Sequence, residues 1–310
     1  MSFYLIGIDE AGYGPQLGPL VVGSVVFELP ERYLVEKGSF VRASCLWQIL
    51  SRIISPDKLS SDKITVCDSK KLYQPCRGLM HLEKTALAFT SLIDPNYLGL
   101  KRHNMGLPVS SVKTDIGLLA ESLKNELASN EIKFCEFKVK VVEPLEFNRG
   151  LVSYGNKADL LWAISSGLIK YFVDKYSGEN IIFQAGKQGG RTYYQSFISK
   201  LFPDRIIKAL KEIKNHSSYL VDSFKPSGKR ININFIRDGD ASEFVIALAS
   251  IYAKYSRELG MLEFNRFFCS HIPGLKPTSG YYSDSRQFVR SIMPLLKKLN
   301  LDKDNFVRNK

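Results

Sequence analysis

Short apolar runs in the sequence predict five buried β-strands. Residues 3–8 form the first, and residues 17–29, rich in valine, form the second beyond a turn of glycine and proline. Residues 132–142 alternate in part between apolar and polar side chains, as expected of a half-buried strand. The other two are the apolar run 180–185 and the alternation of isoleucine and asparagine in residues 231–236.

Helical periodicity recurs through the rest of the chain. In residues 45–54, apolar side chains stand at 45, 46, 49, 50, 53 and 54, the spacing of one helix face. Further helices are predicted at 79–92, 112–127, 157–173, 193–201, 241–268 and 288–299, with a loop rich in Gly, Pro and Asn between the first two of these. Strands come early and alternate with helices later. This order predicts an α/β fold, a mixed central sheet flanked by helices, with a helical C-terminal part at about 255–310.

No internal repeat and no low-complexity linker interrupts the pattern, so residues 1–310 are predicted to form a single domain. Segment 203–230 is basic and polar. It is either an arm that binds nucleic acid or a solvated loop, and the sequence leaves both alternatives open.

The composition narrows the classes of protein that fit this pattern. Apolar residues make up 45% of the chain, with 19 Phe and 15 Tyr, which is enough for a sizeable core. No stretch reaches the roughly 18 apolar residues that a membrane span needs, and the first residues lack the basic segment of a signal peptide. The five cysteines are widely spaced without a CxxC pair. Neither a disulfide framework nor a zinc site is expected, and the cytoplasm is the expected compartment.

The net charge favours a polyanionic partner. A charge of +12 and a pI near 9.3 suit nucleic acid, although many basic proteins bind none. The nature of the ligand therefore has to come from particular residues.

Two adjacent acids, Asp9 and Glu10, end the first predicted strand just before a glycine turn. Their charges repel and burial disfavours both, so such a pair is solvated, paired with cations or bound to metal. In a strand the two side chains point to opposite faces, so a metal site would combine one carboxylate with a neighbouring oxygen. The plainer interpretation, two solvated acids at the end of a strand, stays open.

A third acid, Asp240, immediately precedes the longest helical segment. Asp at the N-cap with Glu243 at the third helical position forms a capping box, with Asp in place of the usual Ser or Thr. The start of a helix fixes a capping carboxylate, which can then also reach a metal ion. The two roles do not exclude each other.

Four segments, in the same order along the chain, resemble motifs of the ribonuclease HII family. They are residues 7–15 (GIDEAGYGP) with 18–23 (GPLVVG), residues 68–72 (DSKKL), residues 240–254, and residues 279–281 (SGY). Each motif is short, but their shared order makes the resemblance specific, and it extends along the whole chain. The chain is longer than a minimal member of the family, with insertions expected near 30–60 and 203–230.

The resemblance implies a ribonuclease H-like fold and hydrolysis of the RNA strand of an RNA–DNA hybrid with Mg²⁺ or Mn²⁺. It assigns Asp9, Glu10 and Asp240 as catalytic residues that bind the metal. Hard divalent cations prefer carboxylate oxygens, and two such ions activate the attacking water and stabilise the leaving 3′ oxygen. The resemblance further implies substrate binding by Gly12, Tyr13, Gly14, Ser69, Lys70, Lys187, Arg191, Lys254 and Tyr281.

Gly186 is the first departure from the family pattern. The resemblance places a further catalytic, metal-binding Asp here, at the end of strand 180–185, and no acid lies between Glu179 and Asp204. Loss of this ligand should weaken metal binding. The open explanations are an engineered inactivation, a natural loss of activity, or replacement by a carboxylate from elsewhere in the chain, with Asp159, Asp238 and Glu258 as the candidates.

Tyr13 is the second departure. The family has Arg between the two glycines of this turn, where it contacts ribose 2′-hydroxyls, the group that distinguishes RNA from DNA. Tyrosine donates a hydrogen bond or stacks on a sugar, but it lacks the charge and the fork of Arg. Gly12 and Gly14 still permit close approach of the backbone. Tyr281 is expected to stack on a sugar near the cut, with an ordinary core or surface aromatic as the alternative.

Three hypotheses follow for a protein expected to be monomeric and to bind nucleic acid rather than membrane. The first is a metal-dependent endoribonuclease that acts on RNA–DNA hybrids, impaired or inactive here because of Gly186. The second is a protein that binds hybrid or duplex nucleic acid without catalysis. The third, to which Tyr13 adds weight, is a DNA-directed nuclease or junction resolvase of the same superfamily.

Overall fold

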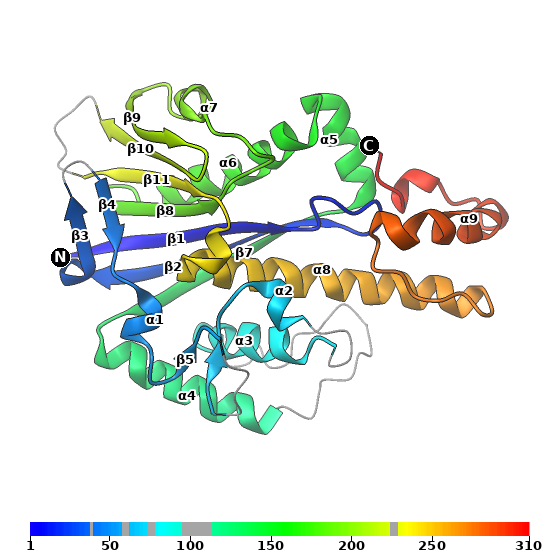
Figure 1. Ribbon diagram of the computed structural model, residues 1–310, viewed down its shortest axis with the longest axis horizontal. Coiled ribbons are helices and arrows are strands. Elements are labelled where there is room, and N and C mark those ends of the chain that lie inside the picture. Colours follow the sequence, from blue (N-terminus) through cyan, green and yellow to red (C-terminus); the bar gives the residue numbers. More distant parts are fainter. Residues whose placement is uncertain (38–39, 58–61, 74–77, 95–112, 224–228, 310) are drawn as a thin grey trace.

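A seven-stranded mixed β-sheet forms the centre of the protein (Figure 1). The computed structural model describes residues 1–37, 40–57, 62–73, 78–94, 113–223 and 229–309. The strands lie in the order β7-β2-β1-β8-β11-β10-β9; β1, β8 and β11 are parallel, and the other neighbours are antiparallel. Their bounds are β1 Ser2–Ala11, β2 Leu20–Pro30, β7 Lys133–Val142, β8 Asn180–Gly186, β9 Arg205–Ile213, β10 His216–Ser223 and β11 Ile231–Ile236.

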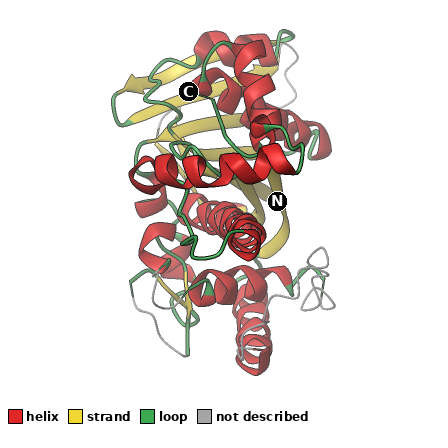
Figure 2. Cartoon of the chain, turned by 90° about the vertical axis from the view of Figure 1, so that its right-hand side faces the viewer, coloured by secondary structure: helices red, strands yellow, loops and turns green. Residues whose placement is uncertain are grey.

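Helices cover both faces of this sheet (Figures 1 and 2). Their bounds are α1 Leu46–Ile49, α2 Ser69–Leu72, α3 Met80–Thr90, α4 Lys113–Ser129, α5 Pro144–Tyr154, α6 Lys157–Lys175, α7 Gln195–Leu201, α8 Phe244–His271 and α9 Tyr282–Lys298. Two small sheets pair β3 Leu34–Lys37 with β4 Phe40–Ala43, and β5 Ile54–Ser55 with β6 Ile64–Thr65. The α/β fold with a mixed central sheet, predicted from the sequence, is confirmed.

The alternation of side chains along β1 divides the core into two layers. Phe3 and Leu5 pack with α8, α3 and α4 on one face of the sheet. Ile6 and Ile8 pack with α6 and α7 on the other face. Because successive side chains of a strand point to opposite faces, the acids that follow these residues also point to opposite faces.

Helix α8 approaches β1 and β2 closely because glycine leaves room for it. A Cβ built on Gly7 would lie 2.0 Å from the carbonyl oxygen of Val245, and one built on Gly23 would lie 2.4 Å from that of Ala249. On the helix side, Ala249 and Ala253 are small and fully buried. Backbone therefore packs directly against backbone along this contact.

The five predicted strands are confirmed as β1, β2, β7, β8 and β11. The helix predicted at 45–54 is wrong beyond its first turn, since only Leu46–Ile49 is helical and the chain then turns into β5. The periodic apolar residues Leu50, Ile53 and Ile54 are buried all the same. Their spacing reflected burial in the core rather than a continuous helix.

The sequence pattern missed α5 and the β9–β10 hairpin. Segment 203–230 is not a solvated loop, because its described part forms β9, an edge strand of the main sheet, and β10, the strand next to it. Exposed lysines such as Lys208 and Lys211 on β9 obscured the strand pattern. The loop predicted between 92 and 112 lies largely outside the described residues. In the described part, none of the helices combines the length and the apolar character that a membrane span requires.

Replacing Gly7 with alanine tests the close packing of α8. The added Cβ would overlap the backbone of Val245, so α8 has to move off the sheet, and we expect the free energy of unfolding to fall by about 3 kcal/mol. Gly167→Ala is the matched control, because Gly167 lies on the exposed side of α6 with open space around it. That change should stabilise the protein by up to about 1 kcal/mol. Urea unfolding measures both, and a Gly7→Ala variant as stable as the wild type contradicts the close contact.

Candidate active site

The carboxyl ends of three parallel strands meet at one edge of the sheet and bring distant residues together. Asp9 and Glu10 lie at the end of β1, and Asp240 lies in the turn after β11. Gly186 ends β8, the strand between them. Ligands of open α/β sheets bind at this edge, so these residues mark the place to look for a site.

A cleft of about 360 Å³ opens at this edge. It gathers most of the residues that the sequence had singled out. Its lining includes Asp9, Glu10, Gly12, Tyr13, Gly14, Ser69, Lys70, Gly186, Lys187, Asp240, Lys254 and Tyr281. Arg191 is the one predicted site residue that does not line it.

Asp9 points to the α8 face of the sheet, where it meets Ser250. The Ser250 hydroxyl hydrogen-bonds the Asp9 carboxylate and lies 3.0 Å from the Ser69 hydroxyl. A Ser250 that donates to Asp9 accepts from Ser69, so two hydroxyls link α2 through α8 to the end of β1. Burial, followed by the charges of Glu10 and Asp240, raises the pKa of Asp9 well above its usual value, and the bond from Ser250 offsets part of that rise.

Glu10 points to the opposite face of β1. Burial raises the pKa of Glu10 to about 7; the charge of Asp240 adds to the rise, whereas Lys70 and a backbone hydrogen bond oppose it. Without a bound cation, this carboxyl exchanges its proton near neutral pH.

Asp240 lies in η3, a 3-10 turn at Gly239–Ala241, and the predicted capping box is wrong. Helix α8 begins only at Phe244, and the side chain of its N-cap residue, Glu243, makes no capping hydrogen bond. The 3-10 turn separates Asp240 from the helix, so its carboxylate is directed into the cleft instead. Burial and then the neighbouring Asp68 carboxylate raise the pKa of Asp240, and the two carboxyls hydrogen-bond each other.

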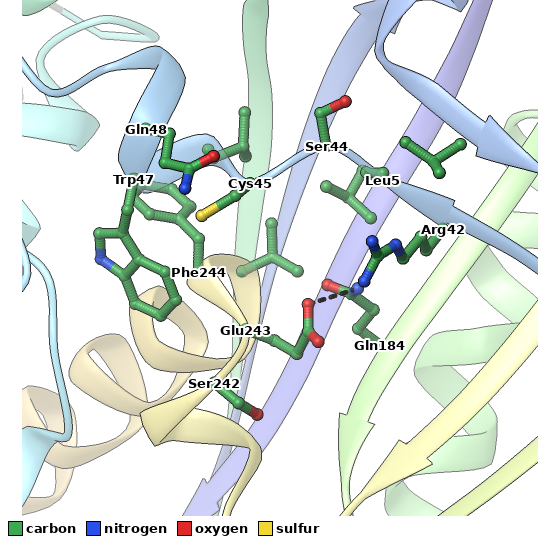
Figure 3. Close-up of a pocket in the computed structure, with 14 residues that line it drawn as sticks. Leu5, Arg42, Ser44, Cys45, Trp47, Gln48, Gln184, Ser242, Glu243 and Phe244 are labelled. Carbon is green, nitrogen blue, oxygen red and sulfur yellow. Dashed lines mark hydrogen bonds between the residues drawn. The ribbon is translucent and has the colours of Figure 1, made fainter.

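Glu243, the predicted partner in the capping box, turns to the sheet instead. Its carboxylate accepts a hydrogen bond of 2.8 Å from the side-chain amide of Gln184 on β8 (Figure 3). This pair lines a second cavity of about 380 Å³, together with Arg42 of β4. Burial raises the pKa of Glu243, against the opposing effects of Gln184 and Arg42. The bond ties the start of α8 to the strand that ends in Gly186.

The acids of the cleft do not form a metal site as they stand. In the part of the chain that the structure describes, no group of three or more His, Cys, Asp or Glu side chains is arranged to hold a metal ion. Gly186 offers no side-chain donor at the central strand, and a Cβ built on it would lie 2.4 Å from Asp9 Oδ1. Asp9 therefore occupies the space that a side chain at position 186 needs. The donor set does not fit the expected Mg²⁺ or Mn²⁺ site.

Two of the predicted lysines, Lys70 and Lys254, bring positive charge to the cleft. Lys70, in the first turn of α2, is exposed and acts electrostatically on Glu10 and Asp240. Lys254 Nζ lies 2.8 Å from Glu258 Oε1, so part of its charge is compensated. Lys70 is thus the more available of the two for an anionic ligand.

Lys187 and Arg191 direct their charged groups elsewhere. Lys187 Nζ lies 2.9 Å from Ser217 Oγ on the β9–β10 hairpin, and burial lowers the pKa of Lys187. Arg191 forms an ion pair with Asp159 and stacks 3.9 Å from the centre of the Phe197 ring. Both residues hold the loop after β8 in place.

The glycine turn forms one wall of the cleft. Gly12 has a φ of +84°, a conformation that favours glycine, and open space surrounds Gly14. Tyr13 is half-buried, and its hydroxyl lies against the backbone of Gly189: a Cβ built there would be 2.9 Å from it. Tyr281, which also lines the cleft, is 45% exposed, and the Arg257 guanidinium lies 5.6 Å from the centre of its ring.

The acids considered as replacements for residue 186 lie in different places. Asp159 does not line the cleft and pairs with Arg191. Glu258 does not line it either, and pairs with Lys254 and Arg257. Asp238 lines the cleft, but its side chain is 82% exposed beside Arg237.

Two residues of the site were not singled out from the sequence, Ser250 and Asp68. Ser250 stands within the third motif, seven residues after Glu243, and only the packing of α8 shows that it faces Asp9. Asp68 opens the second motif, and its side chain accepts a hydrogen bond of 2.9 Å from the Lys70 amide as the N-cap of α2. Its motif was the available signal, but its place beside Asp240 depends on tertiary structure.

Comparisons with known proteins find likeness only among solved structures. No family model matches the chain, and no curated protein matches it. The chain is similar to ribonuclease HII of Archaeoglobus fulgidus, solved in a complex with PCNA (16% identity over 99% of this chain and 94% of that one, TM-score 0.44). It is also similar to ribonuclease H2 of Pyrococcus horikoshii (17% identity over 98% of this chain and 92% of that one, TM-score 0.49). A third similar structure is RNase H3 of Aquifex aeolicus (13% identity over 98% of this chain and 71% of that one, TM-score 0.42). The first of these neighbours bears the family name that the motifs suggested, but identities and TM-scores this low say nothing about the activity of this chain.

The raised pKa of Glu10 predicts that the free energy of unfolding falls as the pH rises. The folded protein holds the Glu10 proton up to about pH 7 and the unfolded chain only to about pH 4.5, so stability falls across that window as pH rises. Glu10→Gln removes this loss. The free energy of unfolding of the variant, relative to that of the wild type, should therefore be higher at pH 8 than at pH 5 by at least about 1 kcal/mol. Urea unfolding in EDTA is the measurement, with Asp174→Asn, an exposed change on α6, as the control for removing one charge. A gain that is the same at both pH values contradicts the burial of Glu10.

Proposed function

We propose that this protein binds RNA–DNA hybrids in the cleft and that its hydrolysis of the RNA strand is impaired by Gly186. One observation carries the proposal. A single cleft at the carboxyl edge of the parallel strands gathers three acids, a lysine-bearing helix start and a glycine turn, while its central strand ends without a side-chain donor. The resemblance of the four motifs to the ribonuclease HII family supplies the substrate class.

The walls of the cleft suit a nucleic-acid backbone. Gly12 and Gly14 let a sugar–phosphate chain approach the turn closely, and Lys70 offers an exposed cation beside it. Tyr281 presents an exposed ring for stacking on a sugar or base. The net charge of +12 adds a long-range attraction for a polyanion.

The floor of the cleft suits hydrolysis less well. In this type of phosphodiester hydrolysis, Mg²⁺ or Mn²⁺ activates the water and stabilises the leaving oxygen. Asp9, Glu10 and Asp240 are the acids that would hold such an ion. Without a donor at position 186, they do not form a metal site. Retention of these three acids favours an enzyme with one lesion over a protein that never had the activity.

Binding and its salt dependence test the first half of the proposal. We expect the wild-type protein to bind a labelled RNA–DNA hybrid in EDTA, with an affinity that falls steeply as salt rises. Lys70→Met should weaken binding and lower the slope of log affinity against log salt by about one, because one phosphate contact is lost. Lys124→Met, at an exposed position on α4, is the matched control and should change neither quantity.

Duplex DNA and a four-way junction are measured beside the hybrid. No binding to the hybrid would refute the proposal. Tighter binding to the junction than to the hybrid would transfer it to the DNA-directed alternative, to which Tyr13 adds weight.

Gly186→Asp tests the second half. The new carboxylate displaces the end of the flexible Asp9 side chain and adds an acid on the central strand. We expect Mn²⁺ affinity and the rate of hybrid cleavage each to rise about tenfold or more, and the melting temperature in EDTA to fall because like charges repel. Calorimetry with Mn²⁺, cleavage of labelled hybrid and thermal melting are the measurements.

Gly186→Asn is the matched control, since it has the same size without the charge. Asp9→Asn in each background sets the residual rate. Wild-type cleavage as fast as that of Gly186→Asp, or no gain in either quantity, would remove the role assigned to Gly186.

A further inference from the structure

A buried cation, Arg308, lies beneath the glycine turn of the cleft. It is 2% exposed, its guanidinium donates to the carbonyl oxygen of Pro15, and its backbone amide donates to that of Gln16 at 2.9 Å. The preceding residue, Val307, forms a β-bridge with Leu17. Residues 307–308 thus run alongside the three residues that follow the turn.

Helix α5 fixes this segment from the other side. The side-chain amide of Asn148 donates to the Val307 carbonyl oxygen at 2.9 Å, and its oxygen accepts from the Asn309 amide at 2.7 Å. The Arg308 guanidinium also stacks 4.6 Å from the centre of the Phe147 ring. The segment is therefore a fixed support for the turn.

A second buried guanidinium, that of Arg257 on α8, lies against the turn itself. A Cβ built on Gly12 would lie 2.7 Å from Arg257 Nε, and Arg257 Nη2 donates to the Ser279 carbonyl oxygen at 3.0 Å. Arg257 is 1% exposed. It connects the glycine turn to the segment that carries Tyr281.

Positive charge exceeds negative charge beneath the turn. Glu258 serves both Arg257 and Lys254, whereas Arg308 forms no ion pair with any described residue. Within the described ranges, Nε and Nη1 of Arg308 have no hydrogen-bond partner. Burial and then the charge of Arg257 lower the pKa of Arg308 to about 9. A buried cation without a counter-ion is costly, and its field reaches further than that of a solvated one.

We infer that Arg308 is a positioning residue of the cleft, which holds the glycine turn through Pro15 and Gln16 and supplies buried positive charge that attracts a phosphodiester to the outer side of the turn. The bound phosphate then provides the negative counter-charge that Arg308 lacks inside the protein. The phosphodiester part rests on the proposed function, whereas the support of the turn can be measured without any nucleic acid.

Two substitutions separate the geometry from the charge. Arg308→Met removes the charge and keeps most of the length of the side chain, and Arg308→Lys keeps the charge. Arg290→Met, at an exposed position on α9, removes the same charge from a site outside the cleft and is the matched control. The readouts are amide hydrogen exchange in peptides that cover residues 12–18, without nucleic acid, and the dissociation constant for the labelled RNA–DNA hybrid in EDTA.

We expect Arg308→Met to exchange about tenfold faster at residues 12–18 and to bind the hybrid about tenfold more weakly. Arg308→Lys should recover most of the affinity, and Arg290→Met should stay within about twofold of the wild type in both readouts. Unchanged exchange in a folded Arg308→Met protein overturns the positioning role. Unchanged affinity, or equal weakening by Arg290→Met, overturns the electrostatic role.

Two further results keep the outcomes distinct. A wild-type protein that binds no hybrid refutes the proposed function, while the exchange at residues 12–18 still decides whether Arg308 holds the turn. If Arg308→Met does not fold, as judged by circular dichroism, Asn148→Ala releases the same segment without touching the cation. Faster exchange at residues 12–18 is expected there too, and unchanged exchange overturns the inference.

Discussion

The direct contact between α8 and the first two strands determines the rest of this structure. Gly7 and Gly23 let the helix backbone lie against the sheet, so its height and rotation are fixed without intervening side chains. Residues spaced along one side of the helix then reach the site in order: Ser250 meets Asp9, Lys254 enters the cleft, and Arg257 supports the turn. A small displacement of α8 would move all of these groups together, because one rigid element carries them.

The cleft combines two opposite electrostatic environments. At its floor, burial and the neighbouring carboxylates raise the pKa of Asp9, Glu10 and Asp240, so negative charge is costly there, and Lys70 offsets only part of that cost for Glu10 and Asp240. Beneath its wall, Arg257 and Arg308 form a surplus of positive charge, because Glu258 is shared between Arg257 and Lys254 and Arg308 pairs with no described acid. Under the function proposed above, an extended polyanion is attracted to the wall and repelled by the floor, which favours binding over hydrolysis.

The sequence predicted those parts of the site that depend on local chain chemistry. Asp9 and Glu10 could be found because they end an apolar strand before a glycine turn, and parallel strands bring their ends together. The capping box of Asp240 was wrong because Asp is favoured in turns as well as at helix N-caps, and here it lies in a 3-10 turn. Ser250 could not be assigned without the rotation of α8. Arg308 carries no local signal at all, since its partners lie almost the whole chain away.

The parallel pairing at the centre of the sheet also determines the order in which the protein can fold. β1 pairs with β2 after a short connection, but its pairing with its other neighbour, β8, brings Phe3 beside Asn180, which is far away in the sequence. Closing a loop of that length costs entropy before any contact forms, so folding should be slow compared with that of helical proteins. During synthesis the first hairpin therefore waits, with apolar residues such as Ile6 and Val22 uncovered, until β8 has been made. Apolar surface and strand edges that stay exposed over this interval are prone to aggregation, so the parallel pairing that completes the sheet also makes its assembly vulnerable.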